Sequence, residues 1–506
     1  MFACALWIEK EKKLILARDS AGEKPLYYSM LPQNGLTFAS EVKSLLRIPY
    51  IDRSLDYQAL WDFPTFLWIP EPATAFSAIK SLPRGHILIC DQNTTRIRPF
   101  SPFPTEEINA ASLPDSELIE YTRAIVTQAV ESRLLSDVPV GAFLSGGLDS
   151  SIIATLAARK LSCLDTFTIG FENLHDPYHG MADESAQAET TAQALGSRHH
   201  TLHVTASDFR ALLPEFCDKG DLPFSVSSGL GVLAVSKLAR EKGIKVLLTG
   251  DGADEAFGGY SWYPFLPFSG VSPASSLPQH PVSFQNTGLA IQKRLEILAA
   301  YSPPKRAWAW HYYAAEEEKT ALFSAEPFAE IQSSLRHFGN YKSENWSAID
   351  YIHHDQNFYF PFEMLCKADR MTMAASVEGR IPFAAPSIQA LAKTLSFSQM
   401  IRKTPKGDIL KWPLRKAFED ILPSGVATRQ KHGFNVPVDY WLRNEWKDLF
   451  SATFAPSSAL ARYGLLSSKS EKTAHLLLHD PDRLNGHSLF SFIMLNIWLE
   501  RTEQWK

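Results

Sequence analysis

A glycine-rich turn between an apolar strand and a helix is the feature that most constrains how this chain folds. The apolar run from Val138 to Leu144 predicts a buried strand, Ser145-Gly146-Gly147 interrupts it, and a helical pattern begins at Ser150. At such a turn, backbone N–H groups and the helix dipole attract anions, and glycines let phosphate oxygens approach closely. The segment therefore predicts a phosphate-binding loop at the end of a strand.

This loop differs from a Walker A motif because it has no lysine that would reach the terminal phosphates. The hydroxyls of Ser145 and Ser150 and the carboxylate of Asp149 stand there instead. A carboxylate beside bound phosphates is repelled unless a metal ion lies between them, so Asp149 predicts Mg²⁺. The alternative is a structural turn at the end of a core strand, which suits a lone Ser-Gly-Gly better than it suits this longer pattern.

A second acidic segment, Thr249 to Glu255, also follows an apolar strand. The carboxylates of Asp251, Asp254 and Glu255 repel one another unless they are paired or bound to metal. By itself this pattern is typical of a solvated turn that caps a helix. At the end of a strand in the same sheet as a phosphate loop, Asp254 is better interpreted as a second metal ligand.

Strands and helices alternate in the middle of the chain, which predicts an α/β fold. Strands are expected at residues 166–171, 199–204 and 245–249, with a helix at 184–195. This βαβ rhythm predicts a doubly wound parallel sheet that binds its ligand at the carboxyl ends of the strands. The pattern becomes helical from about Tyr263 onward.

The first hundred residues read mostly as short strands separated by charged or Pro/Gly turns. A segment rich in Pro, Ser and Glu, from 100 to 115, marks a boundary. We therefore expect a β-rich domain over residues 1–100 and a larger domain with a helical C-terminal part over residues 115–506.

Composition limits the classes of partner. A net charge of −5 gives no electrostatic reason to expect nucleic acid, and no apolar run reaches the length of a membrane span. The five cysteines are scattered without a C-x-x-C pair, and the N-terminus lacks the basic start of a signal peptide. These features predict a cytoplasmic enzyme with reduced thiols.

Several segments, in this order along the chain, resemble the glutamine-hydrolysing asparagine synthetase family. The weakest similarity runs from about 264 to 344. The matching segments are 16–28 (LARDSAGEKPLYY), 38–43 (FASEVK), 130–139 (VESRLLSDVP), 145–151 (SGGLDSS), 248–260 (LTGDGADEAFGGY), 367–371 (KADRM), 377–383 (VEGRIPF) and 429–434 (RQKHGF).

The resemblance implies a type-2 glutaminase domain of the Ntn type over residues 1–100 and a PP-loop ATP pyrophosphatase domain after it. It implies a carbon–nitrogen ligase of asparagine biosynthesis that uses ATP and Mg²⁺. The enzyme would adenylate the side-chain carboxylate of aspartate and amidate it with ammonia, releasing AMP and pyrophosphate. Its partners would be small-molecule substrates (aspartate, and ammonia or glutamine) and a second copy in a homodimer.

The resemblance also assigns roles to residues. Asp149 and Asp254 would hold Mg²⁺, and Lys431 would be the catalytic cation, although most lysines in such turns are ordinary surface residues. Glu378 and Arg380 would arrange the acceptor. The nucleotide would contact Leu144, Ser145, Gly146, Gly147, Asp149, Ser150, Ile169, Thr249, Gly250 and Asp251.

Two departures from the family pattern bear on the nitrogen donor and the acceptor. The family's glutaminases use an N-terminal cysteine, whereas Cys4 here falls in a strand that lies well inside that domain, so we expect a partial glutaminase domain without its N-terminal half. We therefore expect this chain to use free ammonia and not to hydrolyse glutamine. Further on, Ala384-Ala385 stand where the family usually has Leu-Asp, and Gly379 replaces a larger residue.

Two other functions stay open at this point. One is a related amide-forming enzyme that acts on a sugar acid, an antibiotic precursor or a peptide. The other is a non-catalytic descendant that binds nucleotide. The pairs His199-His200 and His353-His354 lack the i, i+4 spacing of helical metal ligands, so we expect structural roles for them.

Overall fold

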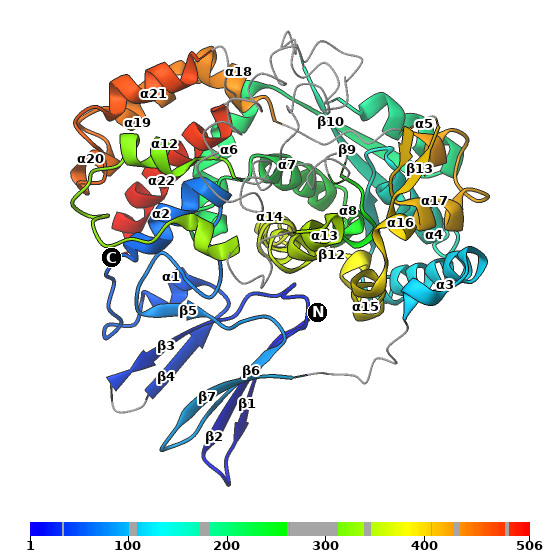
Figure 1. Ribbon diagram of the computed structural model, residues 1–506, viewed down its shortest axis with the longest axis horizontal. Coiled ribbons are helices and arrows are strands. Elements are labelled where there is room, and N and C mark those ends of the chain that lie inside the picture. Colours follow the sequence, from blue (N-terminus) through cyan, green and yellow to red (C-terminus); the bar gives the residue numbers. More distant parts are fainter. Residues whose placement is uncertain are drawn as a thin grey trace.

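The computed structural model places a five-stranded parallel sheet at the centre of the larger part of the molecule (Figure 1). The predicted doubly wound α/β arrangement is confirmed. In spatial order the strands are β10 (Arg198–Val204), β9 (Asp165–Phe171), β8 (Val140–Phe143), β11 (Val246–Leu248) and β12 (Glu378–Arg380). The structure describes residues 1–32, 35–100, 109–172, 183–260, 263, 312–338, 346–405, 407–429, 436–480 and 485–505.

Helices cover both faces of this sheet because its strands carry apolar side chains on both sides. In β11, Val246 and Leu248 join the core formed with α3 and α4, whereas Leu247 packs on the opposite face with Val235 of α7. The helices around the sheet are α3 (Asp115–Arg133), α4 (Leu148–Ala158), α5 (Ser185–Leu195), α6 (Ala206–Gly220), α7 (Ser228–Glu241), α8 (Ala253–Phe257) and α14 (Cys366–Ala374).

The N-terminal part contains two antiparallel sheets, at the bottom of Figure 1. One has the strand order β1-β2-β6-β7 and the other the order β4-β3-β5. Their bounds are β1 (Ala3–Ile8), β2 (Lys13–Arg18), β3 (Tyr27–Leu31), β4 (Gly35–Ala39), β5 (Ile79–Ser81), β6 (His86–Cys90) and β7 (Thr95–Pro99).

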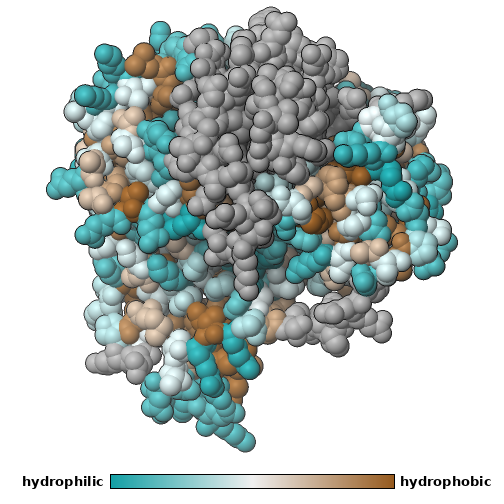
Figure 2. Space-filling model, viewed as in Figure 1, coloured by the Kyte–Doolittle hydropathy of each residue, from teal (hydrophilic) through white to brown (hydrophobic). Residues whose placement is uncertain are grey.

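Apolar side chains are exposed on this β-rich part. They include Phe2, Leu6 and Trp7 of the first strand region and Ile97 of β7. Figure 2 shows brown, apolar residues gathered among hydrophilic ones in the same lower region. The strand β1 lies at an edge of its sheet and is exposed along most of its length.

A helix inside the first hundred residues, α2 (Tyr57–Phe66), ties the β-rich part to the C-terminal helices. It packs in one core with α22, whose side chains are buried nearly all round. The later helices of this core include α12 (Glu316–Leu322), α18 (Val438–Arg443), α19 (Lys447–Phe454), α20 (Ala459–Arg462), α21 (Ser470–Leu478) and α22 (Gly486–Trp505).

Shorter elements connect these layers. They are α1 (Val42–Leu45), η2 (Ala110–Ser112), η4 (Ser334–Phe338), α13 (Ala348–Asn357), the π-helix η5 (Phe360–Leu365), η6 (Pro382–Ala384), α15 (Pro386–Thr394), α16 (Phe397–Met400), β13 (Arg402–Thr404), β14 (Gly407–Ile409), α17 (Trp412–Phe418) and η7 (Val426–Thr428). Among the helices that the structure describes, none is long and apolar enough to cross a membrane.

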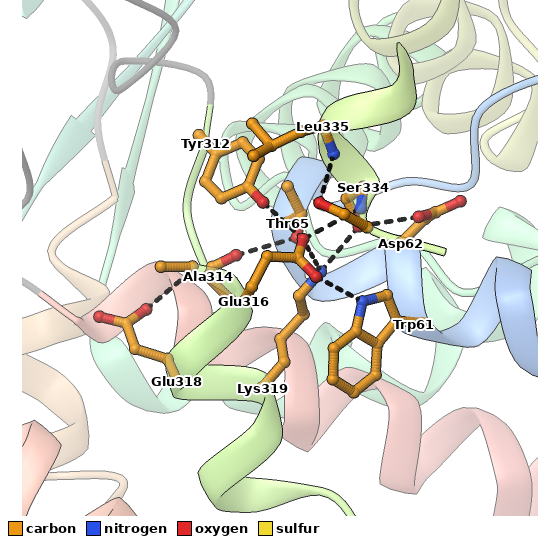
Figure 3. A network of polar contacts seen from close by, with 12 residues as sticks. Trp61, Asp62, Thr65, Tyr312, Ala314, Glu316, Glu318, Lys319, Ser334 and Leu335 are labelled. Carbon is orange, nitrogen blue, oxygen red and sulfur yellow. Dashed lines mark hydrogen bonds and ion pairs between the residues drawn. The ribbon is translucent and has the colours of Figure 1, made fainter. Parts of the chain in front are cut away.

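A buried lysine joins α2, α12 and η4 (Figure 3). The ammonium of Lys319 lies 3.0 Å from a carboxylate oxygen of Glu316 and donates to the Ser334 hydroxyl at 2.7 Å. It also lies 4.7 Å from the centre of the Trp61 ring. Ser334 in turn donates to Asp62 at 2.8 Å. The Lys319 ammonium, which has no exposed surface, is thus matched by the carboxylates of Glu316 and Asp62.

The stability of the protein should depend on the proton of Lys319. Burial lowers its pKa to about 8, against the opposing effect of Glu316 and Asp62. Between about pH 8 and the unfolded pKa near 10.4, the unfolded chain holds this proton and the folded protein does not, so folding is favoured as pH rises. From pH 8 to 10, the Tm of the wild type should therefore rise relative to the Tm of Lys319→Met, as measured by thermal unfolding.

The matched control is Lys237→Met, which removes a lysine that is 40% exposed on α7. Its Tm should run parallel to that of the wild type over the same pH range. Parallel curves for Lys319→Met as well would show that Lys319 keeps its proton in the folded protein.

Candidate active site

The segment 145–151, called here the PP-loop, turns sharply between β8 and α4. Gly146 has a φ of +76°, a backbone conformation that favours glycine. A Cβ atom there would lie 2.7 Å from the Gln187 carbonyl carbon and 2.8 Å from the Ala188 nitrogen, at the start of α5. The loop therefore packs backbone against backbone, and a larger residue at this position would force it away from α5.

The two serine hydroxyls of the PP-loop lie together at the start of α4. The Ser145 and Ser150 oxygens are 3.1 Å apart, and the Gly147 N–H donates to the Ser145 hydroxyl at 3.2 Å. Gly147 is the residue that caps α4. The two hydroxyls therefore lie beside the N-terminus of α4, as expected for an anion-binding turn.

The segment after β11 meets the PP-loop through Gly250. A Cβ on Gly250 would lie 3.0 Å from the Ser150 nitrogen and 3.2 Å from the Asp149 Cβ. Thr249 donates from its hydroxyl to Asp251 at 2.8 Å. The two sequence motifs, a hundred residues apart, are thus in contact at the carboxyl edge of the parallel sheet, as the sequence predicts.

The carboxylates of Asp149 and Asp254 converge on one cation, the ammonium of Lys411. Its Nζ lies 2.5 Å from Asp149 Oδ2 and 2.7 Å from Asp254 Oδ1. The Lys411 side chain is only 4% exposed. Lys411 has a φ of +52° and caps the N-terminus of α17, so its backbone takes a conformation that is rare outside glycine.

This geometry fits a divalent metal ion. Two carboxylates that can both reach one ammonium can also both reach one hard cation, and oxygen ligands are those that Mg²⁺ prefers. In the part of the chain that the structure describes, no group of three or more His, Cys, Asp or Glu residues is arranged for metal. Two carboxylates are enough for Mg²⁺, which is commonly held by one or two carboxylates together with phosphates and water.

Gly259 lies against Lys411 and Asp254 and leaves no room for a side chain of its own. A Cβ on Gly259 would be 2.0 Å from the Lys411 Cε and 2.1 Å from Asp254 Oδ1. Gly259→Ala should therefore displace both groups and lower the rate of any ATP-dependent reaction about tenfold or more, because misplacing a reacting group by about 1 Å costs up to ~10²-fold. Steady-state rates and Tm would measure this.

Gly220→Ala serves as the control, since a Cβ there would make an ordinary 3.5 Å contact with Phe224. Its rate should match that of wild type. An equally active Gly259→Ala would mean that the position of Lys411 has no bearing on the reaction.

The segment before Lys431 reaches the PP-loop. Arg429 donates from its guanidinium to the Gly146 carbonyl, and Arg415 of α17 donates to the carbonyls of Ala427 and Arg429 at 2.6 and 3.1 Å. Burial lowers the pKa of Arg415, while Asp149 and Asp254 act in the opposite direction. The predicted catalytic Lys431 itself lies outside the described residues, as do 430 and 432–435.

Glu378 and Arg380 lie on β12, next to the predicted nucleotide segment. The Arg380 backbone carbonyl accepts from the Thr249 N–H at 3.0 Å. Its guanidinium pairs with Glu378 at 2.9 Å and donates to the carbonyls of Arg133 and Leu135 at 2.8 and 2.7 Å. These contacts fix the end of α3 ahead of β8, and the role of both residues toward an acceptor stays a prediction.

The residues predicted to flank the adenine differ in exposure. Leu144 is 1% exposed and packs into the core, with its N–H donating to the Phe167 carbonyl at 2.9 Å. Ile169 is partly buried on β9 and lies two residues after Phe167, closer to the carboxyl edge of the sheet. Of the two, only Ile169 is partly exposed, and contact of either residue with adenine stays a prediction.

Cys4 and the histidine pairs take no part in this site. Cys4 is exposed near the start of β1, and all five cysteines are free thiols. His200 pairs with Asp165 at 2.9 Å, and His199 contacts the Thr166 hydroxyl at 2.9 Å. His354 is buried in α13.

Comparison with known proteins agrees with this geometry. A family model described as asparagine synthase matches residues 122–500, three quarters of the chain. The chain belongs to the asparagine synthase family. A second model, described as a glutamine amidotransferase domain, matches residues 1–101. The family resemblance stated from the sequence is thus confirmed, and so is membership in a family of glutamine-hydrolysing ligases that use ATP.

Two of the relatives are named asparagine synthetases, and a third is named an amidase. A putative glutamine-hydrolysing asparagine synthetase of Mycobacterium tuberculosis (strain ATCC 25618 / H37Rv) is 33% identical over 462 residues, covering 88% of this chain and 68% of that protein. Asparagine synthetase 1 of Bacillus subtilis (strain 168) is 31% identical, covering 88% and 69%. A differently named relative, amidase chry2 of Gibberella zeae, is 33% identical over 282 residues, covering 51% and 40%.

The sequence interpretation missed Lys411 and Lys367 at this site. Lys367 of α14 is 8% exposed and lies 3.4 Å from Asp251 Oδ1. Its motif, 367–371, was noted in the sequence but given no role. Lys411 stands in an Ile-Leu-Lys-Trp-Pro stretch, where only the helix-starting proline is a local signal, so no feature of the sequence distinguishes it from a surface lysine.

Proposed function

We propose that this protein is an ATP-dependent asparagine synthetase of its family. It would join ammonia to the side-chain carboxylate of aspartate and release AMP and pyrophosphate. The observation that carries the proposal is the convergence of Asp149 and Asp254 on one cation beside the PP-loop. A site of this kind neutralises a departing pyrophosphate, since phosphoryl chemistry depends mainly on positioning and charge compensation.

The chain's own groups would divide the work as follows. Backbone N–H groups of the PP-loop and the hydroxyls of Ser145 and Ser150 bind phosphate oxygens, and Lys411 supplies a positive charge next to them. Mg²⁺ would take the place of the ammonium between Asp149 and Asp254 and would supply further charge neutralisation. An aspartate carboxylate oxygen attacks the α-phosphorus of ATP and pyrophosphate leaves; ammonia then attacks the acyl carbon and AMP leaves.

Lys431 is our candidate for the cation that stabilises charge on the α-phosphate and on the tetrahedral intermediate. Glu378 and Arg380 remain candidates for arranging the acceptor. We propose ammonia as the group that attacks the acyl-adenylate. The five free thiols suit a reducing cytoplasm, which we propose as the location, with a homodimer as the assembly.

A second candidate function is amide formation on a different carboxylate. The similarity to amidase chry2 favours it, as does Ala384-Ala385, where the family usually has Leu-Asp. Ala384 and Ala385 are both buried, at 1% and 9% exposure, so they leave no polar group at this position.

The proposal is tested by incubating the protein with ATP, Mg²⁺, ammonium chloride and aspartate. Pyrophosphate and asparagine should form in equal amounts. Pyrophosphate release with another carboxylate, and none with aspartate, would favour the second candidate. Release of ADP and phosphate would contradict both. In parallel, Cys4→Ala should leave the ammonia-dependent rate unchanged.

A further inference from the structure

The helix α14 carries the 367–371 motif, and the chemistry proposed above uses none of its residues. It contacts the nucleotide segment on one side and the β-rich part on the other (Figure 1). We propose that α14 holds the nucleotide-binding segment 249–252 in place, with Lys367 and Asp369 as positioning residues. Docking of the β-rich part through Lys24 would then set how well ATP binds. This inference rests on the proposed use of ATP at this site.

Towards the β-rich part, α14 makes a nearly buried ion pair. Lys24 Nζ lies 2.6 Å from Asp369 Oδ1, with side-chain exposures of 22% and 9%. Next to it, Arg370 donates to the Tyr27 hydroxyl at 3.2 Å and to the Ser40 carbonyl at 3.1 Å. Two successive residues of α14 thus bind two separate segments of the β-rich part.

The turn that presents Lys24 is rigid. The Asp19 carboxylate accepts N–H bonds from Gly22 at 2.7 Å, Glu23 at 3.0 Å and Lys24 at 3.1 Å. In the same turn, Ala21 is 6% exposed and packs into an apolar cluster with Ala368 of α14. The turn is therefore fixed both within itself and against the helix, so that its position is transmitted to α14.

Towards the nucleotide, α14 contacts the segment after β11. Lys367 lies 3.4 Å from Asp251 Oδ1, and the other Asp251 oxygen accepts from Thr249. Lys367 and Asp369 are two residues apart, so their side chains leave the helix about 200° apart, towards opposite neighbours. One short helix therefore connects the two regions directly.

Two further contacts strengthen this link. The Thr372 hydroxyl accepts from the Gly379 N–H at 3.1 Å, which joins α14 to β12 and so to β11 beside it. Phe360, in the π-helix that leads into α14, lies against Gly252, where a Cβ would be 2.5 Å from the ring. The helix and the segment 249–252 are therefore linked both by an ion pair and by close packing.

Removing one partner of the Lys24–Asp369 pair leaves the other charged, poorly solvated and unpaired, and α14 would have to move to let it reach water. Lys367 moves with the helix. We therefore expect loss of the pair to loosen the segment 249–252, even though Lys24 lies far from this segment along the chain.

The test uses Lys24→Met, Asp369→Asn and the double variant. Binding of a non-hydrolysable ATP analogue with Mg²⁺ should weaken about three- to tenfold in each single variant, the usual scale for coupling through packed elements. Amide hydrogen exchange over residues 246–256 should become faster without nucleotide. The double variant should be no weaker than either single one, because both remove the same contact. Lys13→Met, which removes a lysine paired with Glu11 within the β-rich part, should change neither measurement.

If a single variant fails to fold, the charge-reversed pair of Lys24→Asp with Asp369→Lys supplies the test, since it should restore both exchange protection and analogue binding. Unchanged exchange and binding in folded single variants would overturn the inference, as would a charge-reversed pair that folds without restoring them. Neither readout requires aspartate or amide formation, so a wrong acceptor assignment would leave this test intact.

Discussion

Asp149→Ala and Asp254→Ala should each lower the rate of pyrophosphate release by roughly two orders of magnitude or more, the usual scale for losing a metal ligand or a charge-stabilising group. Each variant leaves a single carboxylate where two converge on the Lys411 ammonium within 2.7 Å. With one ligand lost, the site would neutralise less of the charge on the departing pyrophosphate. Initial rates over a range of Mg²⁺ concentrations would measure the effect.

The control is Asp448→Ala, since Asp448 is 68% exposed and pairs with Arg210 on the molecular surface. Its rate should equal that of wild type at every Mg²⁺ concentration. If Asp149→Ala or Asp254→Ala keeps a rate within a few-fold of wild type, the carboxylate pair does not hold a metal that matters for the reaction.

Lys431→Ala should lower kcat about 10²- to 10³-fold with little change in ATP affinity or Tm, because a cation that acts on charge developing in the transition state contributes mainly there. Lys431 follows Arg429 by two residues, and Arg429 donates to the Gly146 carbonyl of the PP-loop. Lys431→Arg should restore activity only in part, since a planar guanidinium does not replace a compact ammonium.

Lys416→Ala is the matched control, because Lys416 is 42% exposed on α17 and pairs with Glu419. Its kcat should not change. Separate kcat and KM values for Lys431→Ala, together with its melting curve, decide the question. An unchanged kcat would show that Lys431 is an ordinary surface lysine, and a lower Tm with an equal loss of activity would show that it supports the fold.

The central sheet could be predicted because buried parallel strands are continuous apolar runs. The strands β8 and β11 lie in such runs. The strands β9 and β10 contain polar residues and were expected from the alternation of strands and helices. The fifth strand, β12, is only Glu-Gly-Arg, and it forms because Thr372 binds the Gly379 N–H and β11 offers a free edge. A strand made by its neighbours leaves no pattern in its own residues.

The candidate site could be predicted where its residues are adjacent in the sequence. The PP-loop and the segment 249–254 each contain several site residues next to a strand end, and the parallel topology brings the two strand ends together. Lys411 is 262 residues from Asp149, and its place depends on a left-handed backbone at the start of α17 and on the missing side chain of Gly259. Neither condition can be read from neighbouring residues.

The helix α2 shows the same limit in the fold. The first hundred residues read as strands, yet α2 leaves them to pack with α22 near the end of the chain. Its Thr65 hydroxyl donates to the Ala314 carbonyl at 2.9 Å, a contact 249 residues apart. Local patterns predict the elements that surround α2, whereas only the tertiary partner explains its position.

Transfer of oxygen from the acceptor to AMP tests the central claim most directly. With aspartate labelled with ¹⁸O in its side-chain carboxylate, attack on the α-phosphorus leaves a labelled oxygen in AMP when ammonia displaces it. We expect one ¹⁸O atom in the AMP phosphate, none in pyrophosphate, and one in asparagine. Label in inorganic phosphate together with ADP, or AMP without label, would contradict adenylation at this site.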